Sequence, residues 1–137
     1  MKFYEESIEF VKQAGLGSPV WTGRAADGKE LWNFATAVLR HGGRMAAIWG
    51  SDERQRAGGF RLHCVFGIDN GHAQVTLDLP ADNPVYPDLS GIFSAANRMQ
   101  RATRDMLGIA SDGPDQRPWL RHGGWPADWY PLRHDAR

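Results

Sequence analysis

The stretch that decides the fold is FRLHCVFGIDNGHAQVTLDL, residues 60–79. Two runs in which apolar and polar residues alternate, the pattern of half-buried strands, flank the pair Asn70-Gly71. Such a pair between two alternating runs is a strong hairpin signal, because the favoured two-residue turn needs positive φ at both central positions. The stretch therefore predicts a β-hairpin that turns at Asn70-Gly71.

The predicted turn also sets the pairing of the two strands. The expected apolar pairs are Ile68–Ala73, Phe66–Val75, Cys64–Leu77 and Leu62–Leu79. On the opposite face, the same register places His63 opposite Asp78. We therefore expect a sheet with one buried apolar face and one polar face.

A helix is predicted upstream of the hairpin. Asp27 and Glu30 have the spacing of a capping box, and Gly42-Gly43 would end the helix. The apolar residues between them recur at helical spacing: Leu31, Phe34, Ala35, Val38 and Leu39. A strand over residues 44–49 and a polar loop over residues 51–56 then lead into the hairpin.

Further elements are predicted at both ends of this unit. A short helix is expected from Phe3 to Ala14, and a short strand at residues 19–22. After Pro80, Pro84 and Pro87, a second helical region ends at Gly108, either as one helix or as two with a kink near Ser94. Its apolar stripe consists of Leu89, Ile92, Phe93, Ala96, Met99, Thr103, Met106 and Leu107.

These elements predict an α+β fold: a single domain with a mainly antiparallel sheet, a central hairpin and helices packed on it. We place this domain at residues 1–109. Residues 110–137 have neither a helical nor a strand period, and we call them the C-terminal arm.

Composition excludes several classes of function. Lys+Arg and Asp+Glu are both 16, so the chain lacks the excess of positive charge that non-specific nucleic-acid binding requires. One cysteine, Cys64, cannot form an intrachain disulfide, an iron–sulfur cluster or a four-cysteine zinc site. The histidines lack metal-ligand spacing, and no glycine-rich nucleotide loop is present. We therefore expect no bound cofactor, and a cytoplasmic protein that meets the membrane only through partner subunits.

Two side chains on the polar face could form a catalytic pair. His63 opposite Asp78 would orient a base, which is the arrangement of a small stand-alone hydrolase. The simpler interpretation is a cross-strand charge pair, because the predicted hairpin places no nucleophile beside them and directs Cys64 to the other face.

Arginine and aromatic residues gather in the last third of the chain. Arg98, Arg101 and Arg104 share one side of the second helix, and Asp105 follows Arg101 at the spacing of a supporting ion pair. The arm then carries Trp119, Trp125, Trp129, Tyr130, Arg117, Arg121 and Arg133. Such residues either fold back on their own domain or dock on another protein, and their types are those enriched among interface hot spots.

Residues 95–109, AANRMQRATRDMLGI, resemble the signature helix of the C-type peripheral-arm subunit of NADH:quinone oxidoreductase, the NADH dehydrogenase of respiratory complex I. In that family an Asn-Trp-x-Glu-Arg-Glu stretch runs into Asp-x-Phe-Gly-Ile. The later residues Asp115, Arg117, Trp125, Asp128 and Pro131-Leu132-Arg133 are similar to the family's closing segment, which ends Pro-Leu-Arg-Lys-Asp. The similarity runs from about Lys29 onward.

The chain departs from the family pattern inside the signature helix. Arg98 stands where the family has Trp, Gln100 and Ala102 replace two Glu, and Leu107 replaces Phe. His134 replaces the closing Lys. The related module of membrane-bound group-4 nickel–iron hydrogenases, formate-hydrogenlyase-like complexes included, is looser at these positions, so the chain could belong to that branch.

The resemblance implies a non-catalytic subunit. It would dock on the large subunit that carries the quinone or nickel–iron site, lay the arm over that subunit, and bind neither NADH, flavin nor a cluster itself. The residues expected at the interface or anchoring the arm are Arg98, Arg101, Asp105, Trp119, Trp125, Trp129 and Arg133.

Overall fold

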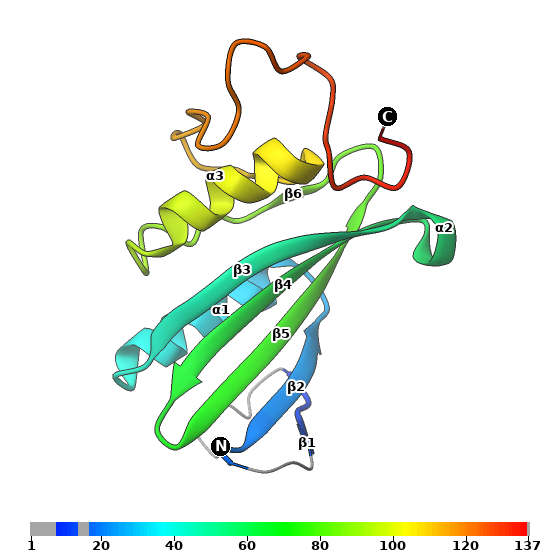
Figure 1. Ribbon diagram of the computed structural model, residues 1–137. Coiled ribbons are helices and arrows are strands. Elements are labelled where there is room, and N and C mark those ends of the chain that lie inside the picture. Colours follow the sequence, from blue (N-terminus) through cyan, green and yellow to red (C-terminus); the bar gives the residue numbers. More distant parts are fainter. Residues whose placement is uncertain (1–7, 14–16, 137) are drawn as a thin grey trace.

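The computed structural model describes residues 8–13 and 17–136, and its centre is a five-stranded mixed sheet (Figure 1). The strand order is β1-β2-β5-β4-β3; β2 and β5 run parallel, and the other neighbours run antiparallel. The strands are β1 Val11–Gln13, β2 Val20–Ala25, β3 Arg44–Glu53, β4 Gly59–Ile68 and β5 Gly71–Pro80. A second, two-stranded sheet joins β6 (Val85–Tyr86) to β7 (Ala110–Ser111). The α+β class is confirmed.

The predicted hairpin is present, but its register is wrong by two residues. The turn lies at Asp69-Asn70, so that Ile68 pairs with Gly71 rather than with Ala73. No non-glycine residue described has positive φ, and Gly71 is not among the glycines that do. Because a shift of two residues keeps every side chain on its face, the predicted buried and polar faces are correct.

The reason for the shift lies outside the hairpin. Gly71 is the first residue of β5 beside the parallel strand β2, and a Cβ atom there would collide with the carbonyl oxygen of Pro19. The same Pro19 oxygen accepts a hydrogen bond from the backbone N–H of His72 at 3.0 Å. Glycine is therefore needed for close approach between strands, not for the conformation of the turn.

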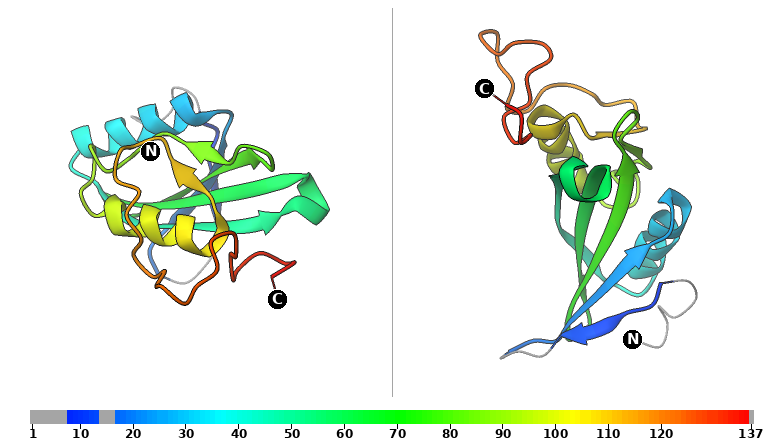
Figure 2. Two further views of the ribbon diagram at one scale, coloured as in Figure 1. Left: turned by 90° about the horizontal axis from the view of Figure 1, so that it is seen from above. Right: turned by 90° about the vertical axis from the view of Figure 1, so that its right-hand side faces the viewer.

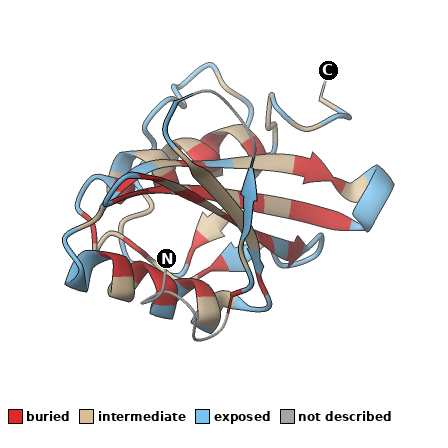
Figure 3. Cartoon of the chain, turned by 90° about the horizontal axis from the view of Figure 1, so that it is seen from below, coloured by how far each residue is buried: buried red, intermediate tan, exposed pale blue. Residues whose placement is uncertain are grey.

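Two helices cover one face of the sheet. Phe34 of α1 (Gly28–Arg40) meets Phe66 edge-on, with ring centroids 5.3 Å apart. On the same face, Phe66 also meets Phe93, which lies shortly before α3 (Ala96–Leu107). Figure 2 shows α1 and α3 on different parts of the twisted sheet, and Figure 3 shows the buried side of α1 directed at the strands.

The helical predictions are largely confirmed. Asp27 accepts a hydrogen bond from the Glu30 N–H at 2.9 Å, and Glu30 reaches back to the N–H of Ala26 at 3.2 Å. The second region is a series of turns followed by one helix that begins after Ser94 and ends at Gly108, where φ is +77°. Within the described residues, no helix combines the length and apolarity needed to cross a bilayer.

Two predicted segments differ from the structure. The helix expected over residues 3–14 is wrong where it is described, since Val11–Gln13 pairs with β2 as a strand. The rest of that segment, apart from residues 8–10, lies outside the described residues. The polar loop expected over residues 51–56 is instead the end of β3 followed by α2 (Arg54–Ala57), because Asp52 and Glu53 continue the pairing with β4.

Candidate docking surface

A buried carboxylate holds the start of the arm. Asp105 on α3 is 1% exposed, and its Oδ2 accepts backbone N–H groups from Trp119 at 2.8 Å, Leu120 at 2.7 Å and Arg121 at 3.2 Å. Three successive N–H groups around one carboxylate form a charge-assisted anchor. The arm crosses α3 at this point.

The predicted ion pair between Arg101 and Asp105 is absent from this described part of the chain. Arg101 donates instead to the carbonyl oxygens of Arg117 at 2.8 Å and Pro118 at 3.0 Å. Both residues of the expected pair thus bind the backbone of the arm. Arg101 binds residues 117 and 118, and Asp105 binds the next three residues, 119–121. A standard pair along the helix is replaced by two contacts between the helix and the arm.

Guanidinium groups and aromatic rings alternate through the arm. Arg121 lies 5.4 Å from the ring centroid of Trp125 and 5.5 Å from that of Tyr130. Arg133 lies 4.2 Å from the Tyr130 centroid and 5.0 Å from that of Phe60, a core residue of β4 that is 2% exposed. We call this series, Trp125–Arg121–Tyr130–Arg133–Phe60, the cation–π column. It connects the arm to the core of the domain.

The end of the arm is held by a second anchor. Arg54 of α2 binds Asp52 through two hydrogen bonds of 2.9 and 2.7 Å, and also binds Asp135 at 2.8 Å. Asp52 accepts in addition the backbone N–H of His134 at 2.9 Å. The Arg54 guanidinium holds the pKa values of Asp52 and Asp135 below their usual range, so both carboxylates are charged at neutral pH.

Between these anchors the arm remains accessible. From residue 112 to residue 136 no residue is buried, and Figure 3 shows this stretch as exposed or intermediate. Trp119 is 47% exposed and Leu132 is 58% exposed. Hydrogen bonds and cation–π contacts therefore hold the arm against its own domain, while much of its apolar surface stays uncovered.

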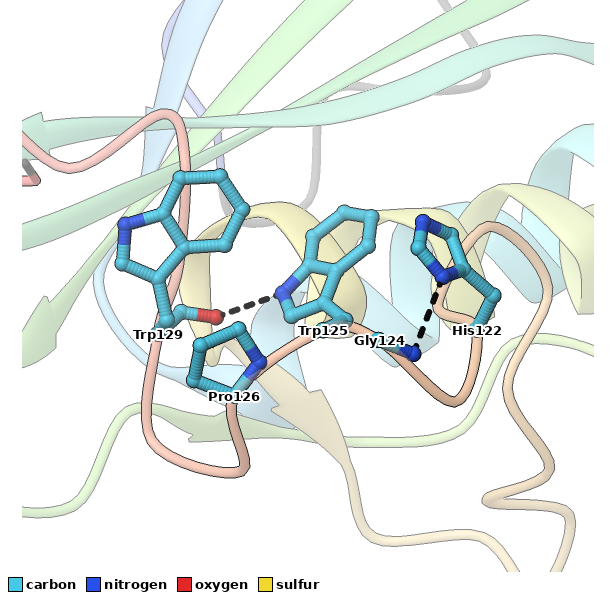
Figure 4. Close-up of a pocket in the computed structure, with 5 residues that line it drawn as sticks. All are labelled: His122, Gly124, Trp125, Pro126 and Trp129. Carbon is cyan, nitrogen blue, oxygen red and sulfur yellow. Dashed lines mark hydrogen bonds between the residues drawn. The ribbon is translucent and has the colours of Figure 1, made fainter.

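The arm takes part in several hollows, and two of them have mainly aromatic or aliphatic linings. The first, of about 330 Å³, is formed within the arm by His122, Gly124, Trp125, Pro126 and Trp129 (Figure 4). The Trp125 Nε1–H donates to the carbonyl oxygen of Trp129 at 2.9 Å, and the two rings stand edge to face with centroids 5.3 Å apart. This bond and the ring contact give the tip of the arm a defined shape.

The second hollow, of about 240 Å³, lies between β3 and α3, and we call it the α3–β3 groove. Its residues include Ile48, Trp49, Met99, Ala102, Met106 and Leu132. Trp49 on β3 is 41% exposed, and Leu132 belongs to the arm. The groove therefore combines sheet, helix and arm in one apolar surface.

The structure separates the pair proposed for a hydrolase. His63 is opposite Thr76, while Asp78 is opposite Arg61 and accepts from the Arg61 Nε–H at 2.7 Å. The Nε2 atom of His63 lies 2.9 Å from the Ser51 hydroxyl, but its Nδ1 atom is buried without a partner. Burial, aided by Arg61, lowers the pKa of His63. Within the described residues no carboxylate is hydrogen-bonded to this ring, and the prediction that His63 lies opposite Asp78 is wrong.

Of the residues predicted for an interface, the structure gathers Arg98, Arg101, Asp105 and Trp119 where the arm crosses α3, while Trp125, Trp129 and Arg133 lie further along the arm. The sequence reasoning missed Asp52 and Arg54, whose partners on the arm are 82 and 81 positions away in the chain, respectively. A spacing pattern cannot identify such pairs. Among the described residues, no group of three or more His, Cys, Asp or Glu could hold a metal ion.

Comparison with known proteins adds a family and several relatives. Residues 26–137 match the family model described as "Respiratory-chain NADH dehydrogenase, 30 Kd subunit". The chain is 32% identical over 101 residues to formate hydrogenlyase subunit 5 of Escherichia coli, covering 71% of this chain and 18% of that protein. It is 36% identical over 64 residues to membrane-bound hydrogenase subunit beta of Pyrococcus furiosus, covering 46% of this chain and 37% of that protein.

A solved structure has the same fold. It is a chain of the membrane-bound sulfane sulfur reductase, an archaeal respiratory membrane complex, with a TM-score of 0.75 at 20% identity. The match covers 93% of this chain and 77% of that one. The fold of this chain thus recurs in a known protein.

Proposed function

Because the chain belongs to the family of the respiratory-chain NADH dehydrogenase 30 Kd subunit, we propose that it is a non-catalytic, peripheral subunit of a membrane-associated oxidoreductase complex. Membership confirms the resemblance carried by residues 95–133. In this proposal the chain docks on the large subunit of its complex through α3 and the C-terminal arm. It takes no part in the chemistry and meets the membrane only through its partners.

The observation that carries the proposal is an arm that is held at both ends while Trp119, Leu120 and Leu132 stay exposed. Asp105 anchors the start and Arg54 the end, so the backbone conformation is stable without a partner. Yet Trp119 is 47% exposed, and exposed tryptophan beside arginine is the composition of interface hot spots. An arm that served only its own domain would bury this surface.

The experiment is isolation of the affinity-tagged full chain from membranes of its own organism, with mass spectrometry of the proteins that remain bound. Trp119→Ala is compared with Trp32→Ala, a matched control on α1 whose tryptophan is 43% exposed. We expect a larger oxidoreductase subunit with the wild type and the control, and its loss with Trp119→Ala. Absence of any such subunit from the wild-type preparation would refute the proposal.

Two kinds of parent complex are candidates: an NADH:quinone oxidoreductase and a hydrogenase-like complex. Formate hydrogenlyase subunit 5 and membrane-bound hydrogenase subunit beta are named for hydrogen metabolism, whereas the family description names NADH dehydrogenase. We propose the hydrogenase-like complex as an alternative to an NADH:quinone oxidoreductase. The isolated complex is assayed for nickel and hydrogen evolution, and separately for NADH-dependent quinone reduction; the activity present identifies the parent.

A further inference from the structure

We propose that the α3–β3 groove receives an apolar side chain of the large partner subunit, and that Arg98 at its rim pairs with a carboxylate beside that side chain. This inference rests on the proposed function and adds a location and a partner chemistry to it. The contact is separate from the tip of the arm. It would make α3 itself a recognition element.

The groove is apolar and only partly filled by its own chain. Met99, Ala102 and Met106 form its wall on α3, and Ile48, Trp49 and Gly50 line it from β3. Leu132 of the arm, which is 58% exposed, also lines the groove. A volume of about 240 Å³ suits one or two apolar side chains rather than a whole helix.

Arg98 borders this groove through its position on α3, because it directly precedes Met99, which lines the groove. Ala102 lies four positions after Arg98, so the two residues share a face of α3. The guanidinium lies 5.0 Å from the ring centroid of Trp119, and the residue is exposed. The stack on Trp119 holds the planar guanidinium where the arm crosses α3, with its N–H groups available to an acceptor.

Arg98 lacks the carboxylate partner that many arginines of this chain have. Among the described residues, those with an ion pair are Arg24, Arg54, Arg56, Arg61 and Arg117. Within the described residues, the Arg98 side chain has no ion pair and no hydrogen bond; its contact is the stack on Trp119. Charge complementarity therefore favours a carboxylate on the partner.

A protein fits this surface better than a lipid headgroup or a nucleic acid. Lipid surfaces and nucleic acids favour proteins with an excess of positive charge, whereas this chain has zero formal net charge, and Arg101 beside Arg98 is already bonded to the backbone of the arm. In formate hydrogenlyase subunit 5, the aligned segment is only 18% of the protein, so the same module is there part of a far larger polypeptide. We therefore infer that the partner is a large protein subunit.

The test begins with a photo-reactive residue at Ala102 in the full chain, expressed in its own organism, and the same residue at exposed Asn33 on α1 as the control. After irradiation of the native complex, we expect Ala102 to cross-link to a peptide of the larger subunit that contains an apolar residue next to Asp or Glu. Cross-links to a second copy of this chain, to lipid, to nucleic acid or to a peptide without a carboxylate overturn the inference.

The charge is tested by reversal. Arg98→Glu should reduce the co-isolated large subunit at least tenfold, whereas Arg40→Glu, on the last turn of α1, should not change it. Replacing the cross-linked carboxylate with Lys should restore binding to Arg98→Glu, which a merely structural role of Arg98 would not allow. Thermal melting of each variant establishes that it folds.

The two proposals fail in different ways. A wild-type chain that isolates without any larger subunit refutes the proposed function and this inference with it. If the large subunit is lost with Trp119→Ala but retained with Arg98→Glu, the proposed function stands and the groove contact is wrong.

Discussion

Asp105→Asn should release the start of the arm without unfolding the domain. One carboxylate oxygen, Oδ2, accepts three backbone N–H groups between 2.7 and 3.2 Å. An amide of the same shape can keep an oxygen at that position but loses the charge, and it places an NH2 group at the position of Oδ1, which is buried without a partner. A hydrogen bond to a charged group contributes roughly 1.5–3 kcal/mol, and water replaces part of this where the arm is exposed. We take about 2 kcal/mol for the whole anchor.

The loss of this free energy is large enough to be measured as more frequent local opening of the arm at residues 119–121. Since 1.4 kcal/mol corresponds to a factor of about ten, the opening equilibrium of residues 119–121 should rise roughly 30-fold. Hydrogen exchange followed by mass spectrometry or NMR reports it at the three amides. Amides in β4 and β5 should exchange as in the wild type, because the strand pairing of the sheet does not involve Asp105.

A matched variant separates this anchor from a general effect of charge. Asp128→Asn removes an exposed carboxylate from the same arm and should leave exchange at residues 119–121 unchanged. If exchange there rises less than about threefold in Asp105→Asn, or rises equally in Asp128→Asn, the anchoring role of Asp105 is refuted.

Three further results are expected. Gly108→Ala should lower the free energy of unfolding by about 1 kcal/mol or more, because φ is +77° there and the new Cβ would lie 3.1 Å from Tyr130 Cζ. Limited proteolysis should then cleave the end of the arm faster, and unchanged cleavage would contradict this. Gly71→Ala should lower the melting temperature more than Gly91→Ala, a position with open space, since only the first collides with Pro19; equal melting temperatures would argue against the close approach. Because the folded-state pKa of Asp52 lies below its unfolded value, its contribution to stability should be complete above about pH 5 and decline as pH falls. The free energies of unfolding of wild type and Asp52→Asn, measured by urea titration, should therefore converge in acid. A difference that does not change with pH would count against this.

Much of the domain follows from local pattern. The capping residues Asp27 and Glu30, the helix behind them and both faces of the hairpin are as the sequence predicts. The register is not, because the preference of Asn-Gly for one turn is weaker than the requirement of β5 to approach Pro19 closely. A contact between segments remote in sequence thus overrides a strong local signal.

The candidate site was less accessible to sequence reasoning. The spacing of Arg101 and Asp105 is correct for an ion pair, but each side chain binds the arm instead. The local pattern predicts Asp52 and Arg54 in a polar loop, because nothing near them in the sequence indicates that His134 and Asp135 come to rest beside them. Whether the predicted interface residues contact a partner stays a prediction.

The cation–π column has a consequence for how this module can diversify. Arg121 and Tyr130, which flank the loop over residues 122–129, belong to the same column, and Trp125 within the loop also packs on Arg121. The other residues of the loop therefore project from a scaffold that is held on both sides. Substitutions or small insertions at loop positions other than Trp125 can change the exposed surface of the arm while the scaffold stays folded. Related chains can therefore vary the surface of this one loop on a constant framework, as antibodies do with theirs.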